Sequence, residues 1–166
     1  MNILPFSINF YGKPENYGVI DKYLSRSAQP KKNDFKWLKQ QGVTDIFNFR
    51  TRIKIGITFN EEDEVKRLGL KYHPIPSITK YPSEDNIIKF LKEVDSIKQS
   101  GGKAHIHCMA GADRTGMYSF IYKMVNRIGT LAENRAEWLK YGLHTDRYPN
   151  LMQWSEMFIS KILNKK

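Results

Sequence analysis

The chain has 166 residues, of which 40% are hydrophobic and 13% aromatic, and this composition excludes a disordered protein. Lysine and arginine outnumber aspartate and glutamate by 27 to 17, a formal net charge of +10. Such a charge favours anionic partners such as phosphoesters, nucleic acid or acidic lipid headgroups, without choosing between them. The single cysteine excludes an intrachain disulfide.

No apolar run is long enough to span a bilayer, and residues 1–10 lack a basic start followed by a long apolar stretch. We therefore expect no signal peptide, no transmembrane segment and a cytoplasmic location. No repeat or flexible linker divides the sequence, so residues 1–166 should form a single domain.

Short apolar runs alternate with amphipathic stretches from residue 19 onward, which predicts strands and helices in alternation. A helix with Asn33 as its N-cap should end at Gly42. A second helix should follow Asn60, where Glu61 and its acidic neighbours suit the positive N-terminal end. In this half of the chain, strands are predicted over residues 19–25, 43–49 and 70–75.

In the second half, a longer helix should begin at Ser83 and end at Gly101. Its apolar residues at helical spacing are Ile87, Ile88, Leu91, Val94 and Ile97. A buried strand over residues 103–107 leads directly into Cys108. Further helices are predicted over residues 115–128, 131–141 and 149–163.

This order of elements predicts an α/β fold, with a central, mostly parallel sheet of four to five strands flanked by helices. In such sheets the loops that leave the C-terminal ends of the strands line one rim, where ligands bind. Arg50, the loop at 76–82 and Cys108 each follow a predicted strand, so they should meet at that rim.

The segment HCMAGADRTG, residues 107–116, lies between a predicted strand and a predicted helix. Successive backbone N–H groups in a tight turn can cradle a phosphate, and a helix N-terminus adds unpaired donors and a positive dipole end. Gly111 permits torsions that other residues resist. The predicted anion-binding residues are Met109, Ala110, Gly111, Ala112, Asp113 and Arg114.

Five residues separate Cys108 from Arg114, so the loop can place both side chains around one phosphoryl group. Arg114 offers planar, bidentate donors to two phosphate oxygens. Cys108, beside a guanidinium and a helix N-terminus, should have a lowered pKa and act as a nucleophilic thiolate. Thr115 can donate its hydroxyl to that sulfur.

Two other interpretations use the same residues. Cys108 can be an inert core residue and Arg114 a surface residue, but the whole ten-residue segment in its strand–loop–helix setting argues against this. A zinc site would need His105 and His107 with Cys108, yet strand alternation places the histidines on one face and the cysteine on the other. We expect no metal and no cofactor.

At this loop the sequence resembles the protein-tyrosine-phosphatase superfamily, closest to its compact dual-specificity branch of bacterial type. The resemblance covers about residues 19–155. The other similar segments are SRSAQP at 25–30, FNFR at 47–50, IP at 75–76 and YGLH at 141–144. The resemblance implies the cysteine-phosphatase fold and a phosphoester hydrolase that works through a cysteinyl-phosphate intermediate without metal.

The family usually takes its general acid from the loop equivalent to residues 76–85. Here that loop holds no carboxylate before Glu84 and Asp85, which also suit the dipole of the helix they begin. Asp113 is the competitor, because an acid directly before the arginine resembles the loops of myotubularin-type and some bacterial lipid phosphatases. The sequence leaves Asp85 and Asp113 both open as the acid.

The substrate is also left open. Met109, Ala110 and Ala112 add no positive charge, whereas the 3-phosphoinositide phosphatases that this loop resembles carry lysines there. Phosphorylated proteins are therefore the first expectation, and phosphoinositides or inositol phosphates the second. The residues that could form a basic rim around the site are Arg26, Arg50, Arg52, Lys54 and His144.

Two further hypotheses concern RNA and a non-enzymatic role. RNA 5′ phosphates fit the net charge, but most aromatic residues are placed as core, and no stable nucleic-acid complex is expected. A non-catalytic phospho-binding module would tolerate loss of the nucleophile. Here the cysteine, arginine and hydroxyl are all present, which favours an enzyme.

Overall fold

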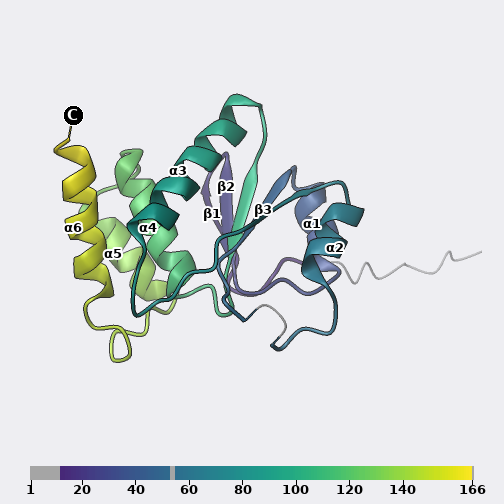
Figure 1. The fold of residues 1–166 in the computed structure, drawn as a ribbon, viewed down its shortest axis with the longest axis horizontal. Helices are drawn as coiled ribbons and strands as arrows, with labels where there is room; N and C mark the ends of the chain where they lie inside the picture. Colours follow the sequence, from purple (N-terminus) through teal and green to yellow (C-terminus); the bar gives the residue numbers. More distant parts are fainter. Residues whose placement is uncertain (1–11, 53–54, 166) are drawn as a thin grey trace, which may run out of the picture.

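The fold is built on a five-stranded sheet with the strand order β1-β2-β5-β3-β4 (Figure 1). The computed structural model describes residues 12–52 and 55–165. β1 is antiparallel to β2, and the other neighbouring pairs are parallel. The strands are β1 (Gly18–Asp21), β2 (Leu24–Ser27), β3 (Asp45–Asn48), β4 (Lys71–Pro74) and β5 (Ala104–His107). The predicted α/β architecture with a mostly parallel central sheet is confirmed.

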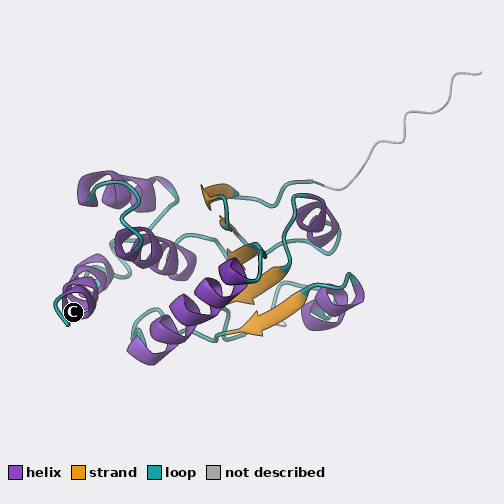
Figure 2. Ribbon diagram, turned by 90° about the horizontal axis from the view of Figure 1, so that it is seen from above, coloured by secondary structure: helices purple, strands orange, loops and turns teal. Residues whose placement is uncertain are grey.

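Helices cover both faces of this sheet (Figures 1 and 2). The smaller group is α1 (Asp34–Gln40) and α2 (Glu61–Arg67), which bury apolar residues against one face. The larger group consists of α3 (Glu84–Gln99) and α4 (Arg114–Val125) on the other face, with α5 (Leu131–Lys140) and α6 (Leu151–Leu163) packed against α4. No helix among the described residues combines the length and apolarity that crossing a membrane requires.

Local details differ from the sequence predictions at three places. The single strand expected over 19–25 is wrong, because Asp21 accepts a hydrogen bond from the backbone of Tyr23 at 2.8 Å and turns the chain into a β1–β2 hairpin. Asn33 makes no side-chain cap for α1. Ile88 is 37% exposed, because Phe90 takes the buried position on α3.

The parallel strands end level with one another. His107 of β5 lies opposite both Ser27 of β2 and Asn48 of β3, and Asn48 lies opposite Pro74 of β4. The loops that follow these residues therefore begin at one rim of the sheet. Cys108, directly after β5, lies at the centre of that rim.

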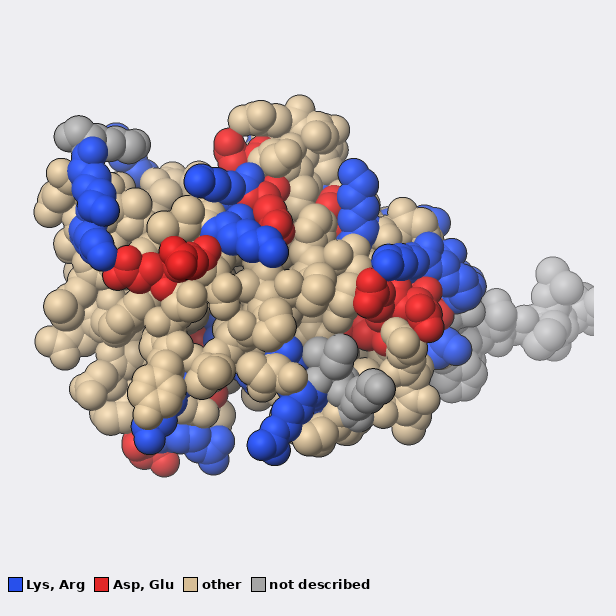
Figure 3. Space-filling model, in the orientation of Figure 1, with Lys and Arg blue, Asp and Glu red and all other residues tan. Residues whose placement is uncertain are grey.

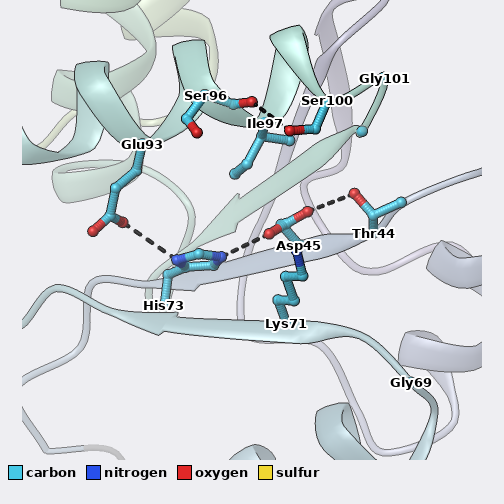
Figure 4. A pocket seen from close by; sticks show the side chains of 11 residues that line it. Thr44, Asp45, Gly69, Lys71, His73, Glu93, Ser96, Ile97, Ser100 and Gly101 are labelled. Carbon is cyan, nitrogen blue, oxygen red and sulfur yellow. Dashed lines mark hydrogen bonds and ion pairs between the residues drawn. The ribbon is translucent and has the colours of Figure 1, made fainter.

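The opposite end of the sheet carries a polar cavity of about 520 Å³ (Figure 4). In it, His73 bridges two carboxylates, with Nε2 2.7 Å from Asp45 Oδ1 and Nδ1 3.3 Å from Glu93 Oε2. Burial alone would raise the pKa of Asp45, but hydrogen bonds from His73 and Thr44 hold it below its usual value. These contacts join β3 and β4 to α3, at the end of the strands remote from Cys108.

Candidate active site

The loop from Cys108 to Asp113 connects β5 to α4, which begins at Arg114. Cys108 is 2% exposed and belongs to the larger hydrophobic core. A charged sulfur at a buried position is unfavourable unless its surroundings compensate for the lost hydration. Three features of this loop bear on such a charge: the direction of its amides, the arginine side chains near it, and the start of α4.

Every backbone carbonyl oxygen from residue 108 to 112 accepts a hydrogen bond from a donor that lies outside the turn. The donors are His107 Nδ1 to Cys108 O (3.2 Å), Gln29 N to Met109 O (2.9 Å), Asn16 Nδ2 to Ala110 O (3.1 Å), Arg26 Nη2 to Gly111 O (2.7 Å) and Trp138 Nε1 to Ala112 O (2.9 Å). In a trans peptide unit the C=O and the following N–H point in opposite directions. The N–H groups of residues 109–113 therefore face the inside of the turn, as an anion-binding nest requires.

Gly111 is required by this turn. Its φ is +70°, a backbone conformation that side chains disfavour. A Cβ at this position would lie 2.6 Å from the backbone of Ser27 and Ala28, where neither strand nor loop can move aside. The loop therefore packs directly against the end of β2.

Arg114 and Thr115 occupy the first turn of α4. Arg114 is partly buried, and its Nη1 lies 3.4 Å from the carbonyl oxygen of Phe49, so the side chain reaches back over the rim toward the end of β3. Thr115 is fully buried, and its hydroxyl has no hydrogen-bond partner within the described residues. The hydrogen bond to the Cys108 sulfur that the sequence predicts is therefore not formed in this structure.

Two further arginines lie in the electrostatic field of Cys108. Burial lowers the pKa of Arg26 to about 10, and the charges of Tyr141, Glu137 and Cys108 oppose that shift. Burial and the charge of Arg114 lower the pKa of Arg50, again opposed in part by Cys108.

These two arginines are not part of an exposed basic rim, and that expectation needs correction. Arg26 is 1% exposed, stacks 3.8 Å from the ring centre of Tyr141 and donates a hydrogen bond to the carbonyl oxygen of Gly111 in the Cys108 loop. Arg50 is 3% exposed and donates to Gln29 Oε1 at 2.8 Å and to the Arg52 carbonyl at 3.0 Å. Their guanidinium groups are used to hold loops, because buried donors must be satisfied. Lys54 lies outside the described residues.

The two candidate acids are placed very differently. Asp113 accepts hydrogen bonds from the backbone N–H of His144 at 2.9 Å, and Nδ1 of the same histidine lies 2.9 Å from its other oxygen. Its carboxyl group is thus held by the segment around His144. Asp85 is exposed on the first turn of α3. The sequence singled out His144 as a basic residue, but not as the partner of Asp113.

The two histidines of β5 have separate partners. His105 lies between the hydroxyls of Ser25 (2.8 Å) and Ser27 (2.7 Å), and His107 pairs with Glu61. Within residues 12–52 and 55–165, no three His, Cys, Asp or Glu side chains are grouped so that they could hold a metal ion.

The fold and this loop define a cysteine-phosphatase architecture, and comparison with known proteins gives the family. Residues 22–126 match the family model described as "Tc-R-P: Polymorphic toxin system, DSP-PTPase phosphatase". The match spans more than half of the chain, so the chain belongs to this family. It is a phosphatase of the dual-specificity and tyrosine-phosphatase type. No curated protein matches it in sequence.

Solved structures share the fold at low sequence identity. A DUF442 protein from Shewanella putrefaciens CN-32, named as a candidate phosphatase, has a TM-score of 0.73 at 20% identity and covers 92% of both chains. The catalytic domain of the PP-IP phosphatase SIW14 from S. cerevisiae has a TM-score of 0.71 at 21% identity, covering 93% of this chain and 94% of its own. TpbA from P. aeruginosa has a TM-score of 0.68 at 16% identity, covering 89% and 84%.

Proposed function

We propose that this phosphatase cleaves phosphoric monoesters through a covalent intermediate on Cys108. The thiolate forms an S–P bond as the bond from phosphorus to the leaving oxygen breaks, and an acid gives that oxygen a proton. Water then cleaves the S–P bond and returns a proton to the acid. The observation that carries the proposal is the outward binding of all five loop carbonyls, which leaves the amides to stabilise the equatorial oxygens.

Asp113 is the acid in this scheme. Asp113 directly precedes Arg114, the proposed phosphate ligand, and two contacts from His144 fix the orientation of its carboxyl group. The ring Nδ1 of His144 can accept a hydrogen bond from the acid form of Asp113 or donate one to its carboxylate, so this contact is compatible with both protonation states that the scheme requires. Asp85 remains the alternative, as an exposed carboxylate that suits the α3 dipole.

Asp113→Asn should therefore slow hydrolysis of an alkyl phosphate by roughly 10²- to 10⁴-fold, because a poor leaving group needs the proton most. An aryl phosphate with a good leaving group should be affected far less. Asp85→Asn is the matched control and should leave both rates nearly unchanged. The measurement is kcat/KM for the aryl phosphate and the alkyl phosphate as a function of pH. Equal losses on both substrates, or a larger loss in Asp85→Asn, would contradict the assignment.

Phosphorylated proteins are the substrate class that the loop supports best. Met109 is 54% exposed at the loop, and neither it nor the two alanines bring a positive charge toward a polyanion. A cysteine-to-serine variant of TpbA has been crystallised in complex with pTyr; it covers 93% of this chain at 15% identity, with a TM-score of 0.68. That protein shows that this fold can bind phosphotyrosine.

A second candidate class, inositol phosphates, is favoured by a different feature. A cleft of about 360 Å³ adjoins the loop at Met109 and is lined by Lys31 and Lys32, with Arg50 at its wall. A second phosphate of a polyphosphorylated ring could bind there. The fold relative SIW14 is described as a PP-IP phosphatase.

The two classes can be separated by comparing kcat/KM for a tyrosine-phosphorylated peptide and an inositol polyphosphate. We expect the peptide to be hydrolysed more efficiently, and Lys31→Ala/Lys32→Ala to leave its rate unchanged. A preference for the inositol polyphosphate that is lost in the double variant would instead make inositol phosphates the favoured substrate class. RNA 5′ phosphates belong in the same panel, although basic side chains on the face in Figure 3 are interspersed with acidic ones and form no continuous band.

A further inference from the structure

The segment that leads into β1, residues 12–17, lies against the catalytic loop, and we call it the strap. Its backbone is tied to the end of β2, because the carbonyl oxygen of Glu15 accepts a hydrogen bond from the N–H of Ala28 at 2.9 Å. Its last residue, Tyr17, packs edge-on against Trp37, with the ring centres 5.2 Å apart. The strap is therefore fixed on both sides of Asn16. It lies outside residues 22–126, the part that matches the family model.

The side chain of Asn16 bridges two distant carbonyl groups. Its Nδ2 donates to the carbonyl oxygen of Ala110 at 3.1 Å and to that of Tyr141 at 3.0 Å. A side-chain amide has two N–H donors, so both are used here. The backbone of Asn16 is left-handed, with a φ of +53°, a conformation that asparagine adopts more readily than most residues. The residue type thus meets both requirements of this position.

The bond to Ala110 controls one peptide unit of the catalytic loop. The carbonyl of this unit belongs to Ala110 and its N–H to Gly111, and the two point in opposite directions. A flip of the unit requires a large change in φ at residue 111, which glycine tolerates at both signs of φ. This peptide unit is therefore the one in the loop that the backbone itself restrains least. The hydrogen bond from Asn16 supplies the missing restraint.

The second bond, to Tyr141, anchors the amide of Asn16. Tyr141 directly follows α5, and its carbonyl is one of those at a helix end that need a partner from outside the helix. The tyrosine ring is itself held in place. Arg26 stacks on it, and its hydroxyl lies so close to Gly18 that a Cβ there would be 1.8 Å away. The amide of Asn16 is thus fixed by a group outside the loop, so it holds the loop to a rigid support.

We propose that Asn16 is a positioning residue of the active site: its bond to the carbonyl of Ala110 keeps the N–H of Gly111 turned toward the bound phosphate. The inference rests on the proposed role of the loop as the phosphate site. Asn16 acts through Gly111 and not by contact with the substrate. Its own hydrogen bonds are exposed, so their contribution to the free energy of unfolding is small. Its effect should therefore appear in phosphate binding and in catalysis.

The test compares wild-type protein with Asn16→Gly, which removes both donors but accepts the left-handed φ without strain. The affinity for inorganic phosphate, measured by calorimetry, should fall about tenfold, because one charge-assisted hydrogen bond is weakened. The amide resonance of Gly111 in ¹⁵N–¹H spectra should move on addition of phosphate in the wild type, and much less in the variant. For para-nitrophenyl phosphate, kcat should fall by about 10- to 100-fold and KM should change less.

Arg127→Gly is the matched control. Arg127 is also exposed and left-handed, with a φ of +57°, and it lies beyond the C-terminal end of α4, whereas the loop precedes the N-terminal end. Replacement by glycine adds the same freedom to the unfolded chain at both positions, so the two melting temperatures should fall alike. Phosphate affinity and kcat should stay at wild-type values in the control. If Asn16→Gly does not fold, Asn16→Ala carries the test and should show the same losses.

The proposal would be overturned by a folded Asn16 variant whose phosphate affinity, Gly111 shift and kcat match those of the wild type, or by equal losses in Arg127→Gly. Failure of the proposed function would be recognised separately. In that case the wild-type protein would hydrolyse no phosphoester, or Cys108→Ser would retain activity. The phosphate affinity and the Gly111 resonance need no turnover, so they would still distinguish Asn16→Gly from the control.

Discussion

Cys108→Ser is expected to lower kcat for para-nitrophenyl phosphate by at least about 10⁴-fold, because a serine hydroxyl in the same position stays protonated and attacks phosphorus poorly. The site is 2% exposed, but serine and cysteine differ only in one atom and have nearly the same size. The fold should therefore be retained. Thermal melting and circular dichroism of the variant check this. The assay compares initial rates at matched enzyme concentrations.

Binding should survive that change. The amides of residues 109–113 and the guanidinium of Arg114 are untouched, so a phosphotyrosine peptide should still bind to Cys108→Ser without being hydrolysed. A variant that binds and turns over substrate at a rate close to that of the wild type would show that sulfur is not the nucleophile.

Arg114→Lys is expected to lower kcat/KM by roughly 10²- to 10³-fold even though the charge is kept. Lysine offers a point charge in place of two parallel N–H donors, and so it loses the bidentate contact to the equatorial oxygens as charge builds on them. The loss should fall mainly on kcat, because the contact strengthens in the transition state. Steady-state kinetics on para-nitrophenyl phosphate measure the split.

Arg52→Lys provides the control for this change. Arg52 follows β3 at the same rim but is exposed, and we assign its side chain no phosphate contact. Its kinetics should match those of the wild type. An Arg114→Lys enzyme that keeps more than about a tenth of wild-type kcat/KM would contradict the role of Arg114 as the phosphate clamp.

Much of the fold could be predicted from the sequence because its signals are local. The helix caps at Asn60 and Ser83 are present, with side-chain oxygens that accept from the backbone three residues ahead at 3.1 and 3.2 Å. The strand that ends at Cys108 and the helix that follows it were also predicted. The β1–β2 hairpin was missed, because its turn depends on one side-chain bond of Asp21 within a short apolar run.

The burial of Arg26 and Arg50 could not be predicted from the sequence. Arg26 and Arg50 look like surface cations in a sequence, since arginine is rarely buried. Their burial depends on carbonyl and aromatic partners that other segments supply, including Gly111 and Tyr141, which lie in later parts of the chain. The Asp113–His144 contact likewise joins residues that are 31 positions apart.

The chemistry proposed for the loop can be predicted from the sequence, because Cys108, Gly111 and Arg114 lie within seven consecutive residues and their spacing limits what can surround one phosphate. How the loop is held depends on contacts that the folded chain brings together. Asn16 and Arg26 reach it across 94 and 85 positions, and Glu61 reaches it from α2 through His107. Hydrogen bonds between such distant residues leave no periodic trace in a sequence, because they form only when the sheet brings the strand ends together.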